Sequence, residues 1–322
     1  MRVFVAGATG AVGRELVPAL ISAGHTVAGL TRSADKAEAI QRMGAQPVVA
    51  DIFDAPLIRQ AFTSFQPEIV IHEMTGLSGA TDYKHFDRSF AATNRLRTEG
   101  TDLLLMAARE VGARRFIAQS FCGWPFARSG GATKSESEAL DLDPPAEQRR
   151  TLEAIEYLER AVTSSRVPEG IVLRYGVLYG AGTGILEPAM IDLIRRRRMP
   201  LIGDGGGWWS FLHVEDAASA AVAAIGRGAP GNIYNIADDD PARVREWLPA
   251  LAAVLGAKPP LHIPAWLGRL VAGEHLVSMM TQVRAGSNDK AKRGLGWRPA
   301  HPSWRVGFAD IAQHDFARHS AA

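Results

Sequence analysis

Three glycines near the start of the chain have the spacing of a loop that binds a pyrophosphate. Gly7, Gly10 and Gly13 directly follow an apolar run, Arg2–Ala6, and precede a segment of helical periodicity, Ala11–Ala23. Glycines at this spacing permit a tight turn and let backbone N–H groups approach phosphate oxygens at the positive end of a helix. We therefore predict a strand, a turn and a helix that together bind a dinucleotide.

The end of the second predicted strand, Thr26–Leu30, distinguishes the two forms of such a dinucleotide. A site that prefers NAD(H) carries an acidic residue there, which binds the ribose 2′-hydroxyl. This chain has Thr31, Arg32 and Ser33 instead. Because a guanidinium binds phosphate oxygens well, we predict NADP(H) as the cofactor, with NAD(H) the less favoured form. The alternative interpretation is that Arg32 is an ordinary solvated loop residue.

The composition excludes several classes of protein. The chain has 322 residues, 47% of them hydrophobic, and a formal net charge of only +2, so we expect no nucleic-acid or membrane partner. Its one cysteine, Cys122, rules out an internal disulfide framework and fits a reducing compartment. No signal-like segment and no run of roughly 20 apolar residues is present, so we expect a cytoplasmic protein with a small-molecule substrate.

The first half of the sequence alternates short apolar runs with segments of helical periodicity, which is typical of βαβ units. The predicted strands are Arg2–Ala6, Thr26–Leu30, Gln46–Ala50, Glu68–His72, Arg115–Gln119 and Gly170–Arg174. The predicted helices are Ala11–Ala23, Asp35–Met43, Ala55–Phe62, Asn94–Val111 and Arg149–Ser164. Since crossovers between parallel strands are right-handed, we predict an α/β fold with a Rossmann-type doubly wound parallel sheet.

The pattern becomes less regular after about Gly180, where we predict a smaller substrate-binding lobe. We expect an NADP(H)-binding domain over residues 1–182, with residues 213–237 returning to it, and the lobe over residues 183–212 and 238–322. The elements expected here are the helices Glu187–Arg198, Asp216–Gly226 and Ala242–Leu255 and the strand Asn232–Ala237. Beyond Lys258, prolines and tryptophans interrupt short helical segments.

Several short segments, in their order and spacing, resemble the extended short-chain dehydrogenase/reductase family, also called the NAD-dependent epimerase/dehydratase family. The segments are Val49–Asp51, Val70–His72, Ala91–Asn94, Arg115–Ser120, Leu173–Gly180, Phe211–Asp216, Asn232–Ile236 and Leu295–Pro299. With the glycine turn, the resemblance implies cofactor contacts at Gly7, Thr9, Gly10, Ala11, Val12, Gly13, Arg32, Asp51, Ile52, His72 and Asn94. It also implies a possible homodimer through two helices of the sheet domain.

The sequence departs from this family at the residues that carry its chemistry. In the family a tyrosine, with a lysine four residues later, exchanges a proton with the substrate. None of the tyrosines here has a lysine at that position. Counting back from Arg174 places Gln148 at the tyrosine position, and the family's serine pair becomes Gln119 and Ser120. The catalytic hydroxyl position is then Ser120 or Phe121.

We take Ser120, Gln148 and Tyr157 as the candidate catalytic residues, although an amide such as Gln148 does not ionise near neutral pH. Tyr157 lies on the same predicted helix, nine residues beyond Gln148, so about two turns separate the two. An error of one residue in the register would bring Arg149 or Arg150 into consideration as active-site residues. Hydride transfer remains feasible if another group, or a water molecule, protonates the product.

The sequence favours an NADP(H)-dependent oxidoreductase that acts on a small carbonyl or hydroxy compound through an atypical active site. One alternative is a non-catalytic NADP(H)-binding protein that senses redox state. Another is a nucleotide-sugar epimerase or dehydratase, although those reactions depend on the missing tyrosine and lysine. No group of histidine, cysteine and acidic residues has the sequence spacing of a metal site, and we expect His213 to be structural.

Overall fold

The computed structural model describes residues 1–77, 82–180 and 183–309. Within these residues the main sheet has seven strands, all parallel, in the order β13-β7-β5-β4-β1-β2-β3. The strands are β1 (Arg2–Ala6), β2 (Thr26–Thr31), β3 (Gln46–Val49), β4 (Ile69–His72), β5 (Arg115–Phe121), β7 (Glu169–Tyr175) and β13 (Ile233–Ile236). This order reverses direction at β1 and β4, as in a doubly wound sheet, and it confirms the predicted fold class.

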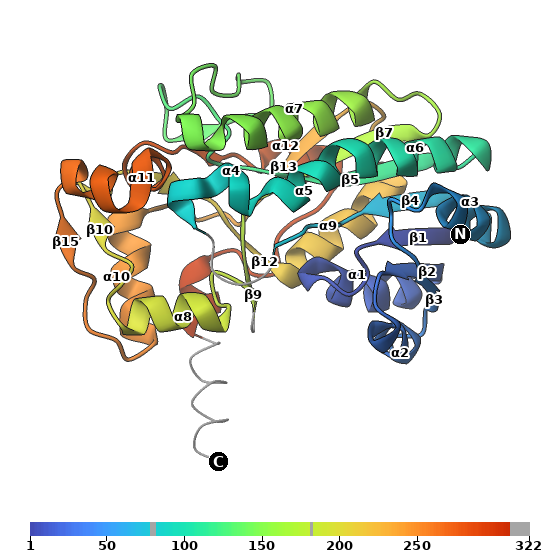
Figure 1. The fold of residues 1–322 in the computed structure, drawn as a ribbon, viewed down its shortest axis with the longest axis horizontal. Helices are drawn as coiled ribbons and strands as arrows, with labels where there is room; N and C mark the ends of the chain where they lie inside the picture. Colours follow the sequence, from blue (N-terminus) through green and yellow to red (C-terminus); the bar gives the residue numbers. More distant parts are fainter. Residues whose placement is uncertain (78–81, 181–182, 310–322) are drawn as a thin grey trace, which may run out of the picture.

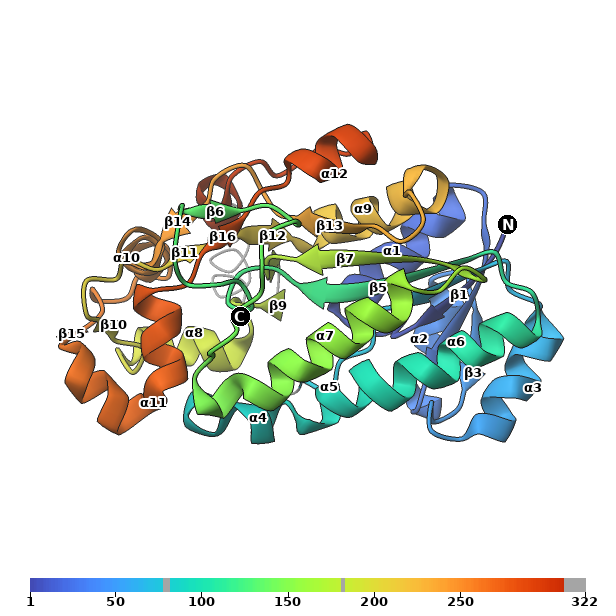
Figure 2. The same cartoon turned by 90° about the horizontal axis from the view of Figure 1, so that it is seen from above.

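Helices cover both faces of the sheet, and Figure 2 shows the three layers from above. One face carries α1 (Ala11–Ser22), α2 (Ala37–Arg42), α9 (Val214–Arg227) and α12 (Asp289–Gly294). The other carries α3 (Ala55–Phe65), α6 (Thr101–Glu110) and α7 (Arg149–Thr163). Each helix buries one apolar stripe, such as Leu16, Val17 and Leu20 on α1, which is the pattern expected of helices packed on a sheet.

The ends of several elements differ from the sequence prediction. The helix predicted over Asn94–Val111 is observed as α5 (Ala91–Arg95), a π-helical turn η3 (Leu96–Gly100) and α6. The predicted helix Asp35–Met43 begins with the short 3-10 turn η1 (Ala34–Lys36) before α2. The first difference is a π-helical turn inside one long helical run and the second is a 3-10 turn at a helix start, and in both the local geometry departs from the regular period that the sequence pattern measures.

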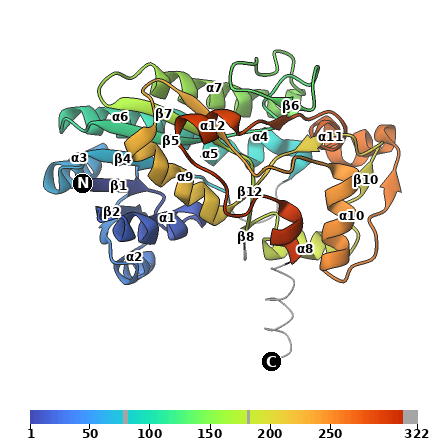
Figure 3. The same cartoon turned by 180° about the vertical axis from the view of Figure 1, so that it is seen from behind.

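The remaining elements form a smaller lobe at one end of the sheet (Figures 1 and 3). Its helices are α8 (Pro188–Arg195), α10 (Val244–Val254) and α11 (Ala265–Thr281), and α4 (Phe86–Ser89) of the sheet domain lies beside them. Its short strands are β8 (Val177–Gly180), β9 (Thr183–Gly184), β10 (Leu201–Ile202), β11 (Trp208–Trp209), β12 (Phe211–His213), β14 (Ala242–Arg243) and β15 (His262–Ile263). The pair β6 (Thr133–Lys134) and β16 (Ala285–Gly286) connects loops of the two parts.

The lobe has an aromatic core of its own. Trp247 is fully buried, with its ring 4.7 Å from that of Trp209 and 5.5 Å from that of Phe211. The helix predicted from Ala242 starts at Val244 instead, because Ala242 and Arg243 pair with β11. Helix α11 was not predicted as one element, and at Gly273 its backbone is non-helical, with φ of 87°.

Candidate functional site

The turn between β1 and α1 has the geometry of a phosphate-binding loop. Gly7 has a φ of 98°, which L-residues rarely adopt, and its carbonyl oxygen accepts a bond from the N–H of Gly10. A Cβ atom at Gly13 would lie 2.2 Å from the Gly7 oxygen, so only glycine fits there. No side chain caps the first turn of α1, so its free N–H groups are available to an anion. A dinucleotide pyrophosphate fits this turn.

The other residues of the turn divide between surface and core. Thr9 and Ala11 are half-buried, and Gly10 is exposed. Val12 is buried in the cluster between α1 and the sheet, so its side chain is a core residue and only its backbone faces the turn. The predicted contacts at these positions therefore involve backbone groups rather than specific side chains.

Arg32 and Asp51 follow neighbouring strands at the same edge of the sheet as the glycine turn. Arg32 comes directly after β2 and is exposed, and among the described residues it forms no ion pair. Asp51 follows β3, is exposed, and accepts a hydrogen bond from the N–H of Phe53 at 3.0 Å. Ile52 is buried against the sheet. Arg32 is thus a cation without an acidic partner in the described structure, as a phosphate-binding residue would be.

His72, at the end of β4, is fully buried, and both of its ring nitrogens contact backbone groups. Its Nδ1 accepts a bond from the N–H of Met74 at 3.2 Å, and its Nε2 lies 3.3 Å from the carbonyl oxygen of Leu96. Burial lowers the pKa of His72 to about 4, so the ring is neutral at physiological pH. Asn94, on α5, donates to the hydroxyl of Thr151 at 3.0 Å. Both side chains connect elements beside the site, and their cofactor contacts remain predictions.

Ser120, on β5, is bonded to a buried ion pair. Its hydroxyl donates to Oε1 of Glu159 on α7 at 2.7 Å. Arg174, the register neighbour of Ser120 on β7, binds both oxygens of that carboxylate at 2.7 and 2.6 Å. Since each member of this group is less than a tenth exposed, the pairing satisfies charges that would otherwise be costly to bury. The hydroxyl of Ser120 therefore faces α7.

Gln148 is fully buried, and its side-chain oxygen accepts a hydrogen bond from Nδ1 of His275 on α11. Burial lowers the pKa of His275 to about 3, so this imidazole is also neutral. Its ring lies 3.9 Å from that of Phe86 and 5.7 Å from that of Trp124. The position where the resemblance expects a tyrosine is therefore inside an aromatic cluster that the second lobe closes, and no acid–base group is present at Gln148.

Tyr157 lies apart from these residues. Its hydroxyl donates to Oδ2 of Asp102 at 2.6 Å, which joins α7 to α6. That hydrogen bond is the main cause that raises the pKa of Tyr157. No hydrogen bond in the described structure links Tyr157 to Ser120 or Gln148, so the structure does not bring the three candidates together.

Glu73 is a buried acid beside the glycine turn that the sequence analysis did not select. Its backbone carbonyl would lie 2.7 Å from a Cβ atom at Gly7. Its Oε1 accepts a bond from the hydroxyl of Tyr175 at 2.9 Å, while Oε2 has no hydrogen-bond partner within the described ranges. Burial raises the pKa of Glu73 to about 8, so the carboxyl is largely protonated near neutral pH. The sequence signal that could have revealed Glu73 is its position, an acidic residue directly after a buried strand.

No helix in the described part of the chain is long and apolar enough to cross a membrane. This agrees with the sequence, which has no long apolar run.

Comparisons with known proteins match the chain over nearly its full length. The family model described as "NAD dependent epimerase/dehydratase family" matches residues 3–237. A 3-diazoavenalumate denitrifying reductase of a Streptomyces species is 43% identical over 309 residues, which cover 95% of this chain and 99% of that protein. A 4-hydroxy-2-methyl-3-oxo-4-farnesyl-3,4-dihydroquinoline-1-oxide ketoreductase of Stigmatella aurantiaca is 28% identical, with 92% of each chain covered. The UDP-glucose 4-epimerase structure from Thermotoga maritima, 22% identical, covers both chains completely with a TM-score of 0.76, which shows a shared fold.

Proposed function

Because this chain belongs to the NAD-dependent epimerase/dehydratase family, we propose that it is an NADPH-dependent reductase that removes the diazo group of a small substrate. Reductases are among its relatives, and the match to the denitrifying reductase extends over 95% of the chain. The observation that carries the proposal is Gln148, an amide bonded to a neutral imidazole where the resemblance expects the family's proton-donating tyrosine.

Removal of a diazo group from its diazonium form needs no proton donor. When bound, NADPH supplies a hydride whose two electrons form the new C–H bond, while the C–N bond breaks and N₂ leaves with its electron pair. The charge is then balanced, because a cation and a hydride give two neutral products. The reduction of a carbonyl differs, since its product oxygen must gain a proton. The replacement of tyrosine by Gln148 therefore removes a group that this reaction does not use.

The chain's own residues bind the cofactor and shape the pocket. The backbone of the turn from Gly7 to Gly13 would hold the pyrophosphate, and Arg32 would bind the 2′-phosphate of NADP(H). Asp51 would bind the adenosine end. The buried aromatic cluster around His275 and Trp124 would offer an apolar surface to a planar substrate.

A second candidate function is the reduction of a carbonyl, and Glu73 is the observation that favours it. This carboxyl is protonated near neutral pH and lies directly after β4, next to the glycine turn. A buried, protonated acid is a suitable proton donor for a product oxygen. Tyr175, bonded to it, would hold its orientation. The ketoreductase relative supports the same alternative.

Isotope transfer separates the two reactions. The purified chain is incubated with NADPH and either a hydroxybenzenediazonium salt or a panel of aldehydes and ketones, and loss of NADPH absorbance is followed. With cofactor deuterated at C4, the denitrified product should carry one deuterium on the carbon that held the nitrogen. The Gly13→Val variant, which should not bind the cofactor, measures direct reduction of the diazonium salt in solution.

Each possible result of this experiment either supports or overturns the proposal. Transfer of cofactor deuterium to the denitrified carbon, well above the rate with Gly13→Val, supports diazo removal. Turnover of carbonyls alone would overturn it in favour of the second function. Binding of NADPH with turnover of neither class would overturn both reactions and favour a redox sensor.

A further inference from the structure

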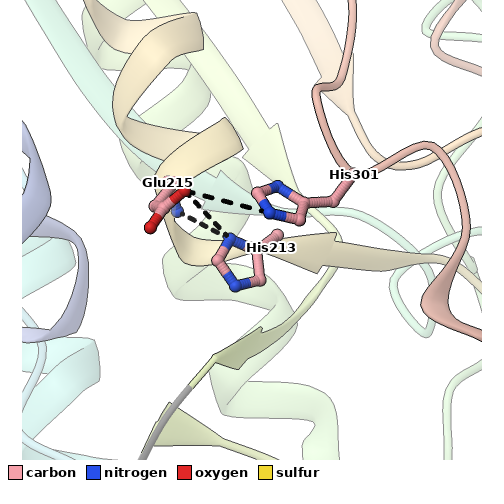
Figure 4. A group of neighbouring side chains, drawn as sticks. All are labelled: His213, Glu215 and His301. Atoms are coloured by element: carbon pink, nitrogen blue, oxygen red, sulfur yellow. Dashed lines mark hydrogen bonds and ion pairs between the residues drawn. The ribbon is translucent and has the colours of Figure 1, made fainter. Parts of the chain in front are cut away.

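Three side chains that could ligate a metal converge at the start of α9, as Figure 4 shows. His213 ends β12, Glu215 is in the first turn of α9, and His301 comes from the loop after α12. Oε2 of Glu215 lies 4.0 Å from Nδ1 of His213 and 3.9 Å from Nε2 of His301. The three potential ligand atoms all lie within 4.8 Å of one another. His301 is far from the other two in sequence, so spacing alone did not reveal the group.

Each of the three atoms has a lone pair that a metal ion could bind. The N–H of Glu215 donates to Nδ1 of His213 at 3.3 Å, so that nitrogen is unprotonated. On His301, Nδ1 lies 3.1 Å from Oδ2 of Asp216, and a carboxylate only accepts, so this Nδ1 carries the proton. In the neutral ring, Nε2 then has the free lone pair. Two imidazole nitrogens and one carboxylate oxygen can therefore each offer a lone pair to one ion, which at His213 would replace the long hydrogen bond from Glu215.

The separations are too long for direct hydrogen bonds and suit a shared cation. Hydrogen bonds between such atoms measure about 2.7–3.2 Å, whereas these gaps are 3.9 and 4.0 Å. Atoms bound to one tetrahedral zinc ion are separated by roughly 3.3 Å, given zinc–nitrogen bonds near 2.0 Å. Rotation of the Glu215 side chain, which is 59% exposed, can close the two gaps that involve its carboxylate.

A buried carboxylate orients one of the two histidines. Asp216 is 1% exposed, and its oxygens accept bonds from the N–H groups of Ala300 and His301 at 2.7 and 2.9 Å as well as from the His301 ring. Metal-ligating histidines usually donate their second ring N–H to a carboxylate in this way. The rings of His213 and His301 also stack, with centroids 3.8 Å apart, which limits their rotation.

We propose that His213, Glu215 and His301 form a site for a divalent transition metal such as Zn²⁺. Two neutral imidazoles and a carboxylate are a ligand set that Zn²⁺ prefers, and a water molecule would complete four-coordination. The bound ion holds the segment around His301 against the first turn of α9. This site is independent of the cofactor turn and of the proposed reductase activity.

Metal binding is measured on the full chain after treatment with a chelator and dialysis. Titration with Co²⁺ should give the visible absorption of a four-coordinate ion, and calorimetry with Zn²⁺ should give one ion per chain. Saturating Zn²⁺ should also raise the melting temperature, because it binds the folded chain. Glu215→Gln and His301→Asn should each weaken Zn²⁺ binding at least tenfold.

Two controls keep the test decisive. Glu215 is exposed, so Glu215→Gln should fold, and circular dichroism checks this. His85→Asn removes an exposed histidine that also contacts a carboxylate, Asp82 at 2.9 Å, and should leave Zn²⁺ affinity unchanged. Equal affinity in the wild type and both site variants, or no Zn²⁺ binding by the wild type, would overturn the site.

Discussion

The glycine turn and the surroundings of Gln148 lie in the same molecule but follow the family to different extents. At the turn, backbone geometry determines the residues, because a Cβ atom at Gly13 would lie 2.2 Å from another backbone oxygen. Around Gln148, side chains determine the chemistry, and a buried amide and imidazole occupy the position expected for a tyrosine. The first region supports dinucleotide binding, and the second supports our proposal that the reaction differs from that of other members.

This difference has a physical origin. A phosphate-binding turn uses backbone N–H groups, which every sequence has, so only the glycines that permit the close approach are constrained. Proton transfer needs a particular ionisable group at a particular place. A family can therefore keep its turn while the acid–base residues are replaced, as we propose for Gln148.

The largest expected effect comes from Gly13→Val. The added side chain would force Gly7 away from α1, so NADPH affinity should fall at least 100-fold, as measured by fluorescence titration. Gly226→Val is the matched control, because a Cβ atom at this helical glycine has nothing within 4 Å. If Gly13→Val bound NADPH as the wild type does, the turn would not be the cofactor site.

Arg32→Asp should weaken NADPH binding by about 10- to 100-fold, because a charge-assisted hydrogen bond contributes roughly 1.5–3 kcal/mol. NADH lacks the 2′-phosphate, so its affinity should change far less. Arg42→Asp reverses the charge of another exposed arginine, on α2, and should affect both cofactors little. Equal losses for NADPH and NADH in Arg32→Asp would refute the role of Arg32.

Glu73→Gln should change how stability depends on pH. Burial raises the pKa of Glu73 from 4.5 to about 8, so the folded state binds a proton that the unfolded state releases. The wild type should therefore lose stability as the pH rises from about 4.5 through 8, by about 1.4 kcal/mol per pKa unit at most. The variant should lose less, since an amide does not titrate.

Urea unfolding at a series of pH values measures this difference. Asp238, whose pKa burial also raises to about 8, is retained in both proteins and so does not affect the comparison. Glu153→Gln, at an exposed position of α7, should leave the pH profile unchanged. A stability gap between wild type and Glu73→Gln that stays constant from pH 5 to pH 9 would show that Glu73 is ionised throughout.

The smallest effect is expected for Ser120→Ala. Its hydroxyl is bonded to Glu159, which keeps both bonds from Arg174 when the hydroxyl is removed. Stability should fall by about 1 kcal/mol, and the rate of diazo removal should change less than tenfold. A fall in kcat of more than 100-fold, with stability unchanged, would mean that Ser120 contacts the substrate directly.

The sequence predicted the sheet and the turn because both depend on local patterns. Strand β1 has the predicted bounds, β4 differs from prediction by one residue at its start, and β7 differs by one residue at each end, since short apolar runs mark buried parallel strands clearly. Helix α11 was missed as one element because its apolar residues do not follow a single stripe and Gly273 interrupts it. The partners of Gln148 and Ser120 depend on contacts between distant residues, which no local pattern encodes.

The return of the chain to the main sheet at β13 affects how the substrate specificity of this fold can change. The chain leaves the sheet after β7, builds much of the lobe, returns for β13 and leaves again. Neither part is therefore a continuous segment, and a single recombination point cannot exchange one lobe for another. A chimaera that carries a relative's whole lobe would need at least three junctions, one after β7 and one on either side of the span from α9 to β13. In such an interlaced architecture, point substitutions in the pocket are the more accessible route to new substrates.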